Sequence, residues 1–190
     1  MLDGASDEDL LAQISARDQR ALRILMARHM RRALRLAQAS TGSATDADDV
    51  AQEAFVRVWH HAASFDPRMA RFTTWFYRIV VNLALDRLRR PRAEALDLAA
   101  DVASDAPDPL ASLVASEEQA ILNGALSEIS ERQRTAIALF HFEGLSGREG
   151  ADVMNLSEKA FESLLIRARA ALKQHVLGAR PRPGAKHDTR

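Results

Sequence analysis

Residues 72–90 read FTTWFYRIVVNLALDRLRR and predict one long helix with an unusual surface. At about 100° per residue, its apolar and aromatic side chains cover more than half of the circumference. Neighbours must therefore pack around this helix on several sides, which predicts a helical bundle built around it. The remaining arc carries a polar stripe: Thr74, Arg78, Asn82, Asp86 and Arg89.

The polar stripe has the chemistry of a nucleic-acid contact. Amide and guanidinium groups hydrogen-bond base edges and phosphates, and the neighbouring rings of Trp75 and Phe76 can stack on bases. Unpaired bases expose the faces that such rings need, so the stripe favours single-stranded nucleic acid over a duplex. A solvated face on an otherwise buried helix is the ordinary alternative, and this segment alone leaves it open.

The composition is that of an ordinary soluble protein, with 47% hydrophobic and 27% charged residues in 190 and no cysteine. No run of residues is apolar enough to span a bilayer, and the acidic N-terminus does not resemble a signal peptide. We therefore expect a cytoplasmic protein without membrane insertion.

The net charge of zero hides an uneven distribution along the chain. Residues 1–92 hold 15 arginines and 11 acids, residues 93–118 hold 7 acids and no base, and residues 119–190 hold 11 bases and 8 acids. We predict an all-α protein of two helical domains, 1–92 and 119–177, joined by an acidic flexible linker over 93–118. Residues 178–190 are expected to form a disordered tail.

The N-terminal block contains three further helical patterns. Ser6 is a predicted N-cap, a second helix is expected from Gln19 to Gln38, and a third runs from Asp46 to His61. Acids in the first turn of that third helix suit its dipole. A metal phosphohydrolase using Asp46, Asp49 and Glu53 is an alternative, but no HExxH or phosphate-loop motif accompanies these acids. We predict no catalytic residue, no metal and no cofactor.

The second block, LSEISERQRTAIALFHFEGLSGREGADVMNLSEKAFESLLIRARAAL over 126–172, has helix-turn-helix spacing. Ser130 and Ser146 begin capping boxes, Gly144 ends a helix, and Asn155 is expected to adopt the left-handed turn conformation. Ser157 would cap the last helix, whose exposed face predicts contacts to duplex DNA. Ile166 is suited to a thymine methyl group, and arginines 167 and 169 and Lys173 are suited to phosphates.

Together these segments resemble a bacterial RNA polymerase sigma factor of the extracytoplasmic-function class (group 4) of the sigma-70 family. DADDVAQEAFVRVW and FDPRMARFTTWFYRIVVNLALDRLRR are similar to the first domain of that family, and EISERQRTAIALFHFEGLSGREGADVMNLSEKAFESLLIRARAAL to its second. The resemblance implies a DNA-binding factor that directs transcription initiation at promoters. A stress response is the expected setting, and the implied partners are RNA polymerase core, promoter DNA as duplex and melted non-template strand, and an anti-sigma factor.

The resemblance also implies roles for individual residues. It implies that polymerase is bound by Asp48, Asp49, Gln52 and Glu53. It implies that minus-10 DNA is contacted by Phe65, Arg71, Thr73, Thr74, Trp75, Arg78, Asn82 and Arg89. It implies that minus-35 DNA is contacted by Ser157, Lys159, Glu162, Ser163, Ile166, Arg167, Arg169 and Lys173.

Two departures from the family pattern affect these expectations. Gly150 stands where a branched apolar residue is usual and should weaken its helix by about 1 kcal/mol relative to alanine. Glu162 and Leu164 stand where basic residues are common, so the promoter sequence does not carry over. An ordinary helix-turn-helix repressor and, after it, the metal phosphohydrolase are the alternative functions.

Overall fold

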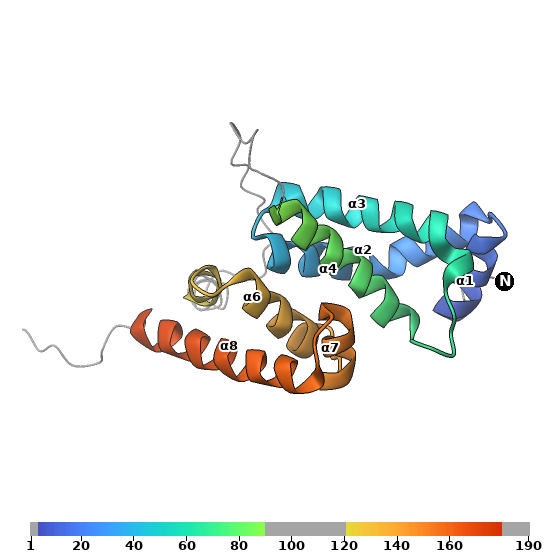
Figure 1. Ribbon diagram of the computed structural model, residues 1–190. Coiled ribbons are helices and arrows are strands. Elements are labelled where there is room, and N and C mark those ends of the chain that lie inside the picture. Colours follow the sequence, from blue (N-terminus) through green and yellow to red (C-terminus); the bar gives the residue numbers. More distant parts are fainter. Residues whose placement is uncertain (1–3, 90–120, 180–190) are drawn as a thin grey trace, which may run out of the picture.

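The computed structural model describes residues 4–89 and 121–179, and all of the regular structure in these ranges is helical, which confirms the all-α fold (Figure 1). The N-terminal part consists of α1 (Asp7–Ser15), α2 (Gln19–Thr41), α3 (Ala44–His61), the 3-10 turn η1 (Ala62–Ser64) and α4 (Phe72–Arg89). The C-terminal part has a helical segment over 121–127, then α6 (Glu131–Ile137), the π turn η2 (Ala138–Phe142), α7 (Gly147–Met154) and α8 (Glu158–Ala179). The predicted linker and nearly all of the predicted tail lie outside the described residues.

The α4 helix is packed on several sides, as its apolar circumference predicted. It lies against α2 and α3 and buries Phe72, Phe76, Tyr77, Val80, Val81 and Ala84. The Phe76 ring, expected to be available to bases, is instead fully buried: it stacks on Phe72 at 5.4 Å between centroids and lies 4.9 Å from Phe55 of α3. Such aromatic pairs stabilise beyond the area they bury and fix the position of α4 in the bundle.

The first helix secures the start of α4. Glu8 of α1 accepts a hydrogen bond from the backbone N–H of Phe72 at 3.1 Å, so a carboxylate satisfies a free donor at the positive end of α4. Asp7 accepts from the buried His29 side chain of α2 at 2.7 Å, and the His29 ring lies edge-on to Phe72. Residues from α1 and α2 thereby orient the end of α4 that carries the candidate strand contacts.

The C-terminal part is a helix-turn-helix unit, and its predicted caps are confirmed. Ser130 and Ser146 form complete capping boxes with Gln133 and Glu149. Asn155 has φ 52° and ψ 50°, the left-handed conformation expected for the turn, and the Ser157 hydroxyl accepts from the N–H of Ala160 at 3.2 Å. The sequence pattern missed the π turn, which follows α6 directly and ends before Gly144 at φ 69°.

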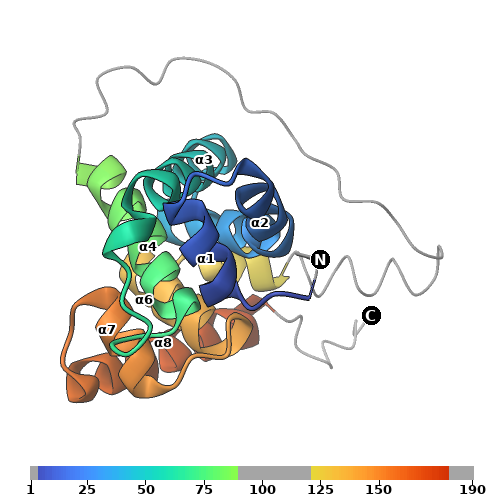
Figure 2. The same cartoon turned by 90° about the vertical axis from the view of Figure 1, so that its right-hand side faces the viewer.

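The two parts pack on each other and do not stand apart. In both views α7 lies alongside α4, and α6 lies next to α2 (Figures 1 and 2). One buried cluster contains residues of both parts, among them Val80 and Ala84 of α4 and Leu139, Leu145 and Val153 of the C-terminal part. The α3 helix lies on the side of α2 and α4 that is opposite the C-terminal part.

The structure explains why position 150 is glycine, which the resemblance to the family did not. A Cβ atom there would lie 2.3 Å from Cζ of Phe161, whose ring is fully buried between α7 and α8. The Phe161 ring therefore occupies the space that a side chain at position 150 would need. The expected gain in helix stability from alanine is opposed by a steric clash in the core.

We expect Gly150→Ala to lower the free energy of unfolding by about 1–2 kcal/mol, because overpacking costs more than the helix propensity restores. In a Phe161→Leu background, the same change should be neutral or stabilising, since the shorter side chain leaves room for a methyl group. Urea titration followed by circular dichroism measures both steps. An unfolding free energy for Gly150→Ala equal to that of the unmodified chain would contradict the steric explanation.

Candidate nucleic-acid and polymerase surfaces

The exposed stripe of α4 begins one turn later than its helical angle predicted. Thr74 is only 3% exposed and belongs to the buried side of α4, which corrects its placement on the open stripe. Arg78 and Asn82 follow on the same side of the helix and are exposed, as are Asp86 and Arg89. Arg89 reaches Asp86 at 3.8 Å, so the end of the stripe is a weak surface ion pair.

Aromatic side chains gather at the N-terminal end of α4. The rings of Phe65, at the end of η1, and Trp75 lie 5.4 Å apart and are both partly exposed. The Arg71 side chain is 81% exposed just before the helix, and Thr73 is partly exposed in its first turn. An indole and a phenyl ring therefore lie together at one end of the stripe, where they can stack on bases, and an exposed guanidinium at the residue before the helix can contact phosphates.

The outer face of α8 projects away from the rest of the molecule. Lys159, Glu162, Ser163, Arg167 and Lys173 are exposed, and Ile166 is 66% exposed although it is apolar. This pattern is that of a recognition helix with one apolar contact among charges.

Three predicted minus-35 residues already have partners within the chain. Arg167 Nε donates to the carbonyl of Ser163, one turn back in α8, at 3.3 Å. The guanidinium of Arg169 lies 5.0 Å from the Phe140 ring centroid, and its Nε donates to His141 Nε2 at 3.1 Å. This packing directs Arg169 toward the body of its own domain. The Ser157 hydroxyl is occupied as the cap of α8, although the residue remains exposed.

The polar side of α3 is exposed, while its other side is buried in the bundle. Asp48, Asp49, Gln52 and Glu53 all lie on this exposed side, in two successive turns. Glu53 pairs with Arg57 at 3.3 Å, and Asp49 accepts from Arg87 of α4 at 2.7 Å. The four predicted polymerase contacts therefore form one acidic surface.

The contacts of Arg87 also count against the alternative of a metal phosphohydrolase that uses Asp46 and Asp49. Its Nε donates to Asp46 while its Nη2 donates to Asp49, so the cation that joins these acids is a guanidinium of the protein itself. Within residues 4–89 and 121–179, no group of three acids or histidines has the arrangement of a metal site. The phosphohydrolase has no geometric support in this part of the chain.

The structure reveals one polar cluster that the sequence pattern did not predict. The Tyr77 hydroxyl of α4 donates to Glu143 Oε2 at 2.6 Å, and Arg32 and Arg35 of α2 approach the same carboxylate at 3.9 and 3.6 Å. Burial raises the pKa of Tyr77, and the hydrogen bond to Glu143 raises it further. Tyr77 belongs to the apolar and aromatic arc of its helix, and the sequence does not indicate its contact with Glu143, because 66 residues separate them.

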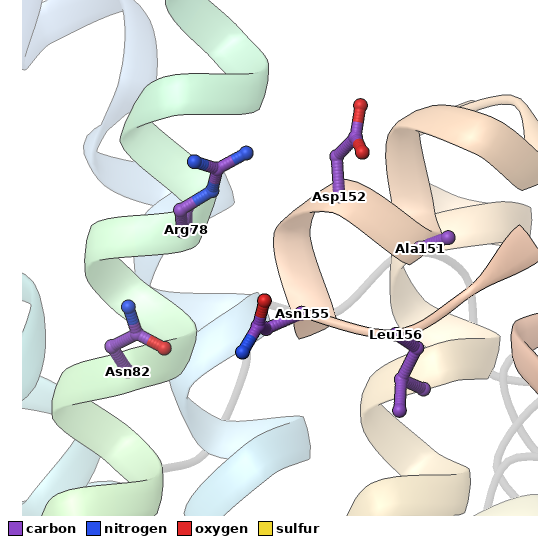
Figure 3. Close-up of a pocket in the computed structure, with 6 residues that line it drawn as sticks. All are labelled: Arg78, Asn82, Ala151, Asp152, Asn155 and Leu156. Atoms are coloured by element: carbon purple, nitrogen blue, oxygen red, sulfur yellow. The ribbon is translucent and has the colours of Figure 1, made fainter.

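The stripe and the C-terminal part meet at a small open pocket. Arg78 and Asn82 of α4 form one wall, and Ala151, Asp152, Asn155 and Leu156 form the other (Figure 3). The side chains of Asn82 and Asn155 point toward each other across the pocket. The helix that would hold a DNA strand is therefore faced here by α7 and the turn after it.

None of the helices in the described ranges combines the length and the apolar character that crossing a bilayer requires. This agrees with the absence of an apolar run in the printed sequence.

Comparisons with known proteins agree with this arrangement of surfaces. Residues 25–102 match the family described as Sigma-70 region 2, and residues 119–172 match Sigma-70, region 4. The chain is 39% identical over 180 residues to the RNA polymerase sigma factor CnrH of Cupriavidus metallidurans, with 88% of this chain and 92% of CnrH covered. It is 36% identical to the ECF RNA polymerase sigma factor SigM of Mycobacterium tuberculosis, with 88% and 83% covered.

Solved structures show the same fold. CnrH in complex with the cytosolic domain of CnrY superposes with a TM-score of 0.68 at 32% identity, covering 92% of this chain and 99% of that one. The sigma factor RpoE of Bartonella quintana, in complex with the anti-sigma factor NepR, gives a TM-score of 0.63 at 20% identity, covers 82% and 96% of the two chains, and supports the fold alone. By its two sequence regions, its relatives and its helical architecture, this chain belongs to the RNA polymerase sigma factors, in their extracytoplasmic-function class.

Proposed function

We propose that this sigma factor binds RNA polymerase core through the acidic side of α3 and directs it to promoters through α4 and α8. The observation that carries the proposal is that one chain presents three separate exposed surfaces of fitting chemistry. These are the acids of α3, the amide, arginines and rings of α4, and the recognition face of α8. As a transcription initiation factor it catalyses no reaction itself, and polymerase makes the bonds.

At the minus-10 element, α4 would hold the opened non-template strand. Asn82 and Arg78 offer donors to base edges and phosphates, and Trp75 with Phe65 offers ring surfaces for unstacked bases. Taking bases out of the duplex costs a few kcal/mol per step, which stacking and hydrogen bonding in the complex can offset. Because Thr74 is buried here, it can contact DNA only after the surroundings of α4 change.

At the minus-35 element, α8 would enter the major groove. Ile166 is at the centre of its exposed face, where it can meet a thymine methyl group, and Glu162 can accept from a cytosine amino group. Lys159, Arg167 and Lys173 would position the helix on phosphates.

An anti-sigma factor is the further partner we propose, with a cytoplasmic location and a stress response as the setting. Support comes from CnrH, 32% identical to this chain, which is solved in complex with the cytosolic domain of another protein, CnrY.

Transcription with purified components tests the function. Core polymerase and fragmented genomic DNA are incubated with and without this chain, and the 5′ ends of the transcripts are sequenced. We expect new start sites that share upstream sequence at two spaced elements. A repressor, the alternative function, would add no transcript under these conditions.

Arg167→Ala should weaken duplex binding to a similar extent on all sequences and reduce the slope of log K against log salt by about 1. Its guanidinium is exposed on α8 and is predicted to contact a phosphate, which carries no base information. Fluorescence anisotropy across a salt series measures the slope on a mapped promoter duplex and on a scrambled one. Arg57→Ala on α3 is the matched control and should leave the slope unchanged. A loss of affinity for the promoter duplex alone would instead show that Arg167 recognises a base.

A further inference from the structure

We propose that, without polymerase, the C-terminal domain docks on α4 as an internal competitor of the DNA strand, and that Glu143 holds it there. The docking is a property of the chain by itself. Its consequence for DNA rests on the function proposed above for α4.

The surroundings of Glu143 place its partners in the other domain. Its side chain is 1% exposed, and its partners are the Tyr77 hydroxyl at 2.6 Å and the guanidinium groups of Arg32 and Arg35 at 3.9 and 3.6 Å. A carboxylate so buried is stable only with hydrogen bonds and opposite charges around it. If the domains separated, all three partners would be lost together and the carboxylate would return to water.

Tyr77 has a matching requirement. It is 1% exposed, and its hydroxyl needs an acceptor at that depth. A tyrosine hydroxyl is protonated in the physiological range, and burial with the hydrogen bond to Glu143 raises its pKa further, so it remains a donor to Glu143. In the docked arrangement, the N-terminal domain therefore contributes a buried donor that Glu143 of the C-terminal domain satisfies.

The π turn presents Glu143 at this position. The N–H of Glu143 donates to the carbonyl of Ala138 at 3.0 Å, five residues back, and Gly144 then reverses the chain at positive φ. An α-helical turn would place the residue after Phe142 at a different angle around the axis. π turns are rare in proteins, but those that occur are often at functional sites. This fits a turn that is kept for the contact of Glu143.

Further contacts stabilise the same interface along α2. Arg134 of α6 is 13% exposed, and its Nε donates to the carbonyl of Ala39 at 3.1 Å, near the end of α2. Gly42, which ends α2 at φ 74°, permits this approach, because a Cβ atom there would lie 3.2 Å from Arg134 Nη2. The hydroxyl oxygens of Thr135 and Ser40 lie 3.0 Å apart in the buried interior.

Carboxylates of the C-terminal domain face the cations expected to meet DNA. Glu149 lies 3.9 Å from Arg71, and Asp152 lines the pocket opposite Arg78 (Figure 3). Like Glu143, these acids place negative charge along one side of α2 and α4, where phosphates would otherwise lie. A strand laid along α4 and the α7 helix would therefore compete for the same space and the same cations.

The docked form leaves the proposed polymerase surface accessible. The acidic side of α3 is exposed and lies on the side of the bundle opposite the C-terminal domain (Figures 1 and 2). Core polymerase can therefore engage α3 before the domains separate. The order that follows is binding to polymerase first, domain separation second and strand capture last.

Distance measurement between spin labels tests the docking directly. The chain contains no cysteine, so Ala63→Cys and Gln174→Cys, both at exposed positions, place one label in each domain of the full-length protein. We expect one narrow distance distribution for the otherwise unmodified chain. Glu143→Lys, which turns the central attraction into repulsion, should broaden and lengthen it, while Glu128→Lys, an exposed change of the same charge, should not.

A charge exchange separates the proposed contact from general damage. Arg32→Glu with Arg35→Glu should separate the domains, and adding Glu143→Arg to this pair should restore the narrow distribution. Circular dichroism of each variant checks that its helical content is unchanged. Failure of Glu143→Lys to alter the distances, or failure of the exchange to restore them, would overturn the assignment of Glu143.

Binding of a fluorescein-labelled single-stranded oligodeoxynucleotide of random sequence tests the competition. Glu143→Lys should bind it about tenfold more tightly than Glu128→Lys, because the docked state no longer competes. Equal binding by separated and docked variants would overturn the competition and also count against α4 as a strand-binding surface. Unchanged distances in Glu143→Lys, with promoter-specific transcription intact, would overturn the docking and leave the proposed function standing.

Discussion

Replacing Asn82 with alanine is expected to reduce open-complex formation about tenfold while leaving binding to core polymerase unchanged. The amide is exposed at the middle of the α4 stripe and offers both a donor and an acceptor to an unpaired base. A contact made only with the opened strand stabilises the melted complex and not the encounter with polymerase. Permanganate reactivity of thymines at a mapped promoter measures melting, and anisotropy with labelled sigma measures core binding.

The position of Asn82 in the pocket requires a matched control. Asn155 faces it from the other domain, and Asn155→Gly removes that amide while keeping the left-handed turn at φ 52°. If Asn82 acted only by holding the domains together, both substitutions would change melting in the same direction. We expect Asn155→Gly to leave melting undiminished. Equal loss of core binding and melting in Asn82→Ala would contradict a role in strand capture.

The helical elements could be predicted because their signals are local. Capping residues such as Ser6, Ser130 and Ser146 act within three positions, and the left-handed turn at Asn155 needs only its own side chain. The apolar circumference of α4 likewise predicted its central place in the bundle. For the same reason, most of the proposed contacts on α3, α4 and α8 are exposed as expected.

The remaining features depend on contacts between distant segments. Thr74 has the angular position of a stripe residue but is buried in the folded chain, and an angle on an isolated helix carries no information about its neighbours. Gly150 is explained only by the Phe161 ring of the next helix. The partners of Glu143 come from α2 and α4, so neither spacing nor composition near residue 143 could have indicated them.

Asp49→Arg is expected to weaken association with core polymerase by tenfold or more, because like charges brought together at an interface cost several kcal/mol. Asp49 is exposed in the middle of the acidic side of α3, between Asp48 and Gln52 along the surface. Pull-down of purified core with tagged sigma measures recovery, and titration of labelled sigma gives the change in Kd.

The ion pair between Asp49 and Arg87 provides the control for that result. Both side chains are partly exposed, at 54% and 41%, so the pair contributes little to folding. Arg87→Ala removes the pair but keeps the negative charge of Asp49, and it should bind core at least as well as the unmodified chain. If Arg87→Ala reproduced the loss seen with Asp49→Arg, the effect would belong to the ion pair between α3 and α4. If only Asp49→Arg weakens binding to core polymerase, Asp49 contacts a cationic surface of the polymerase.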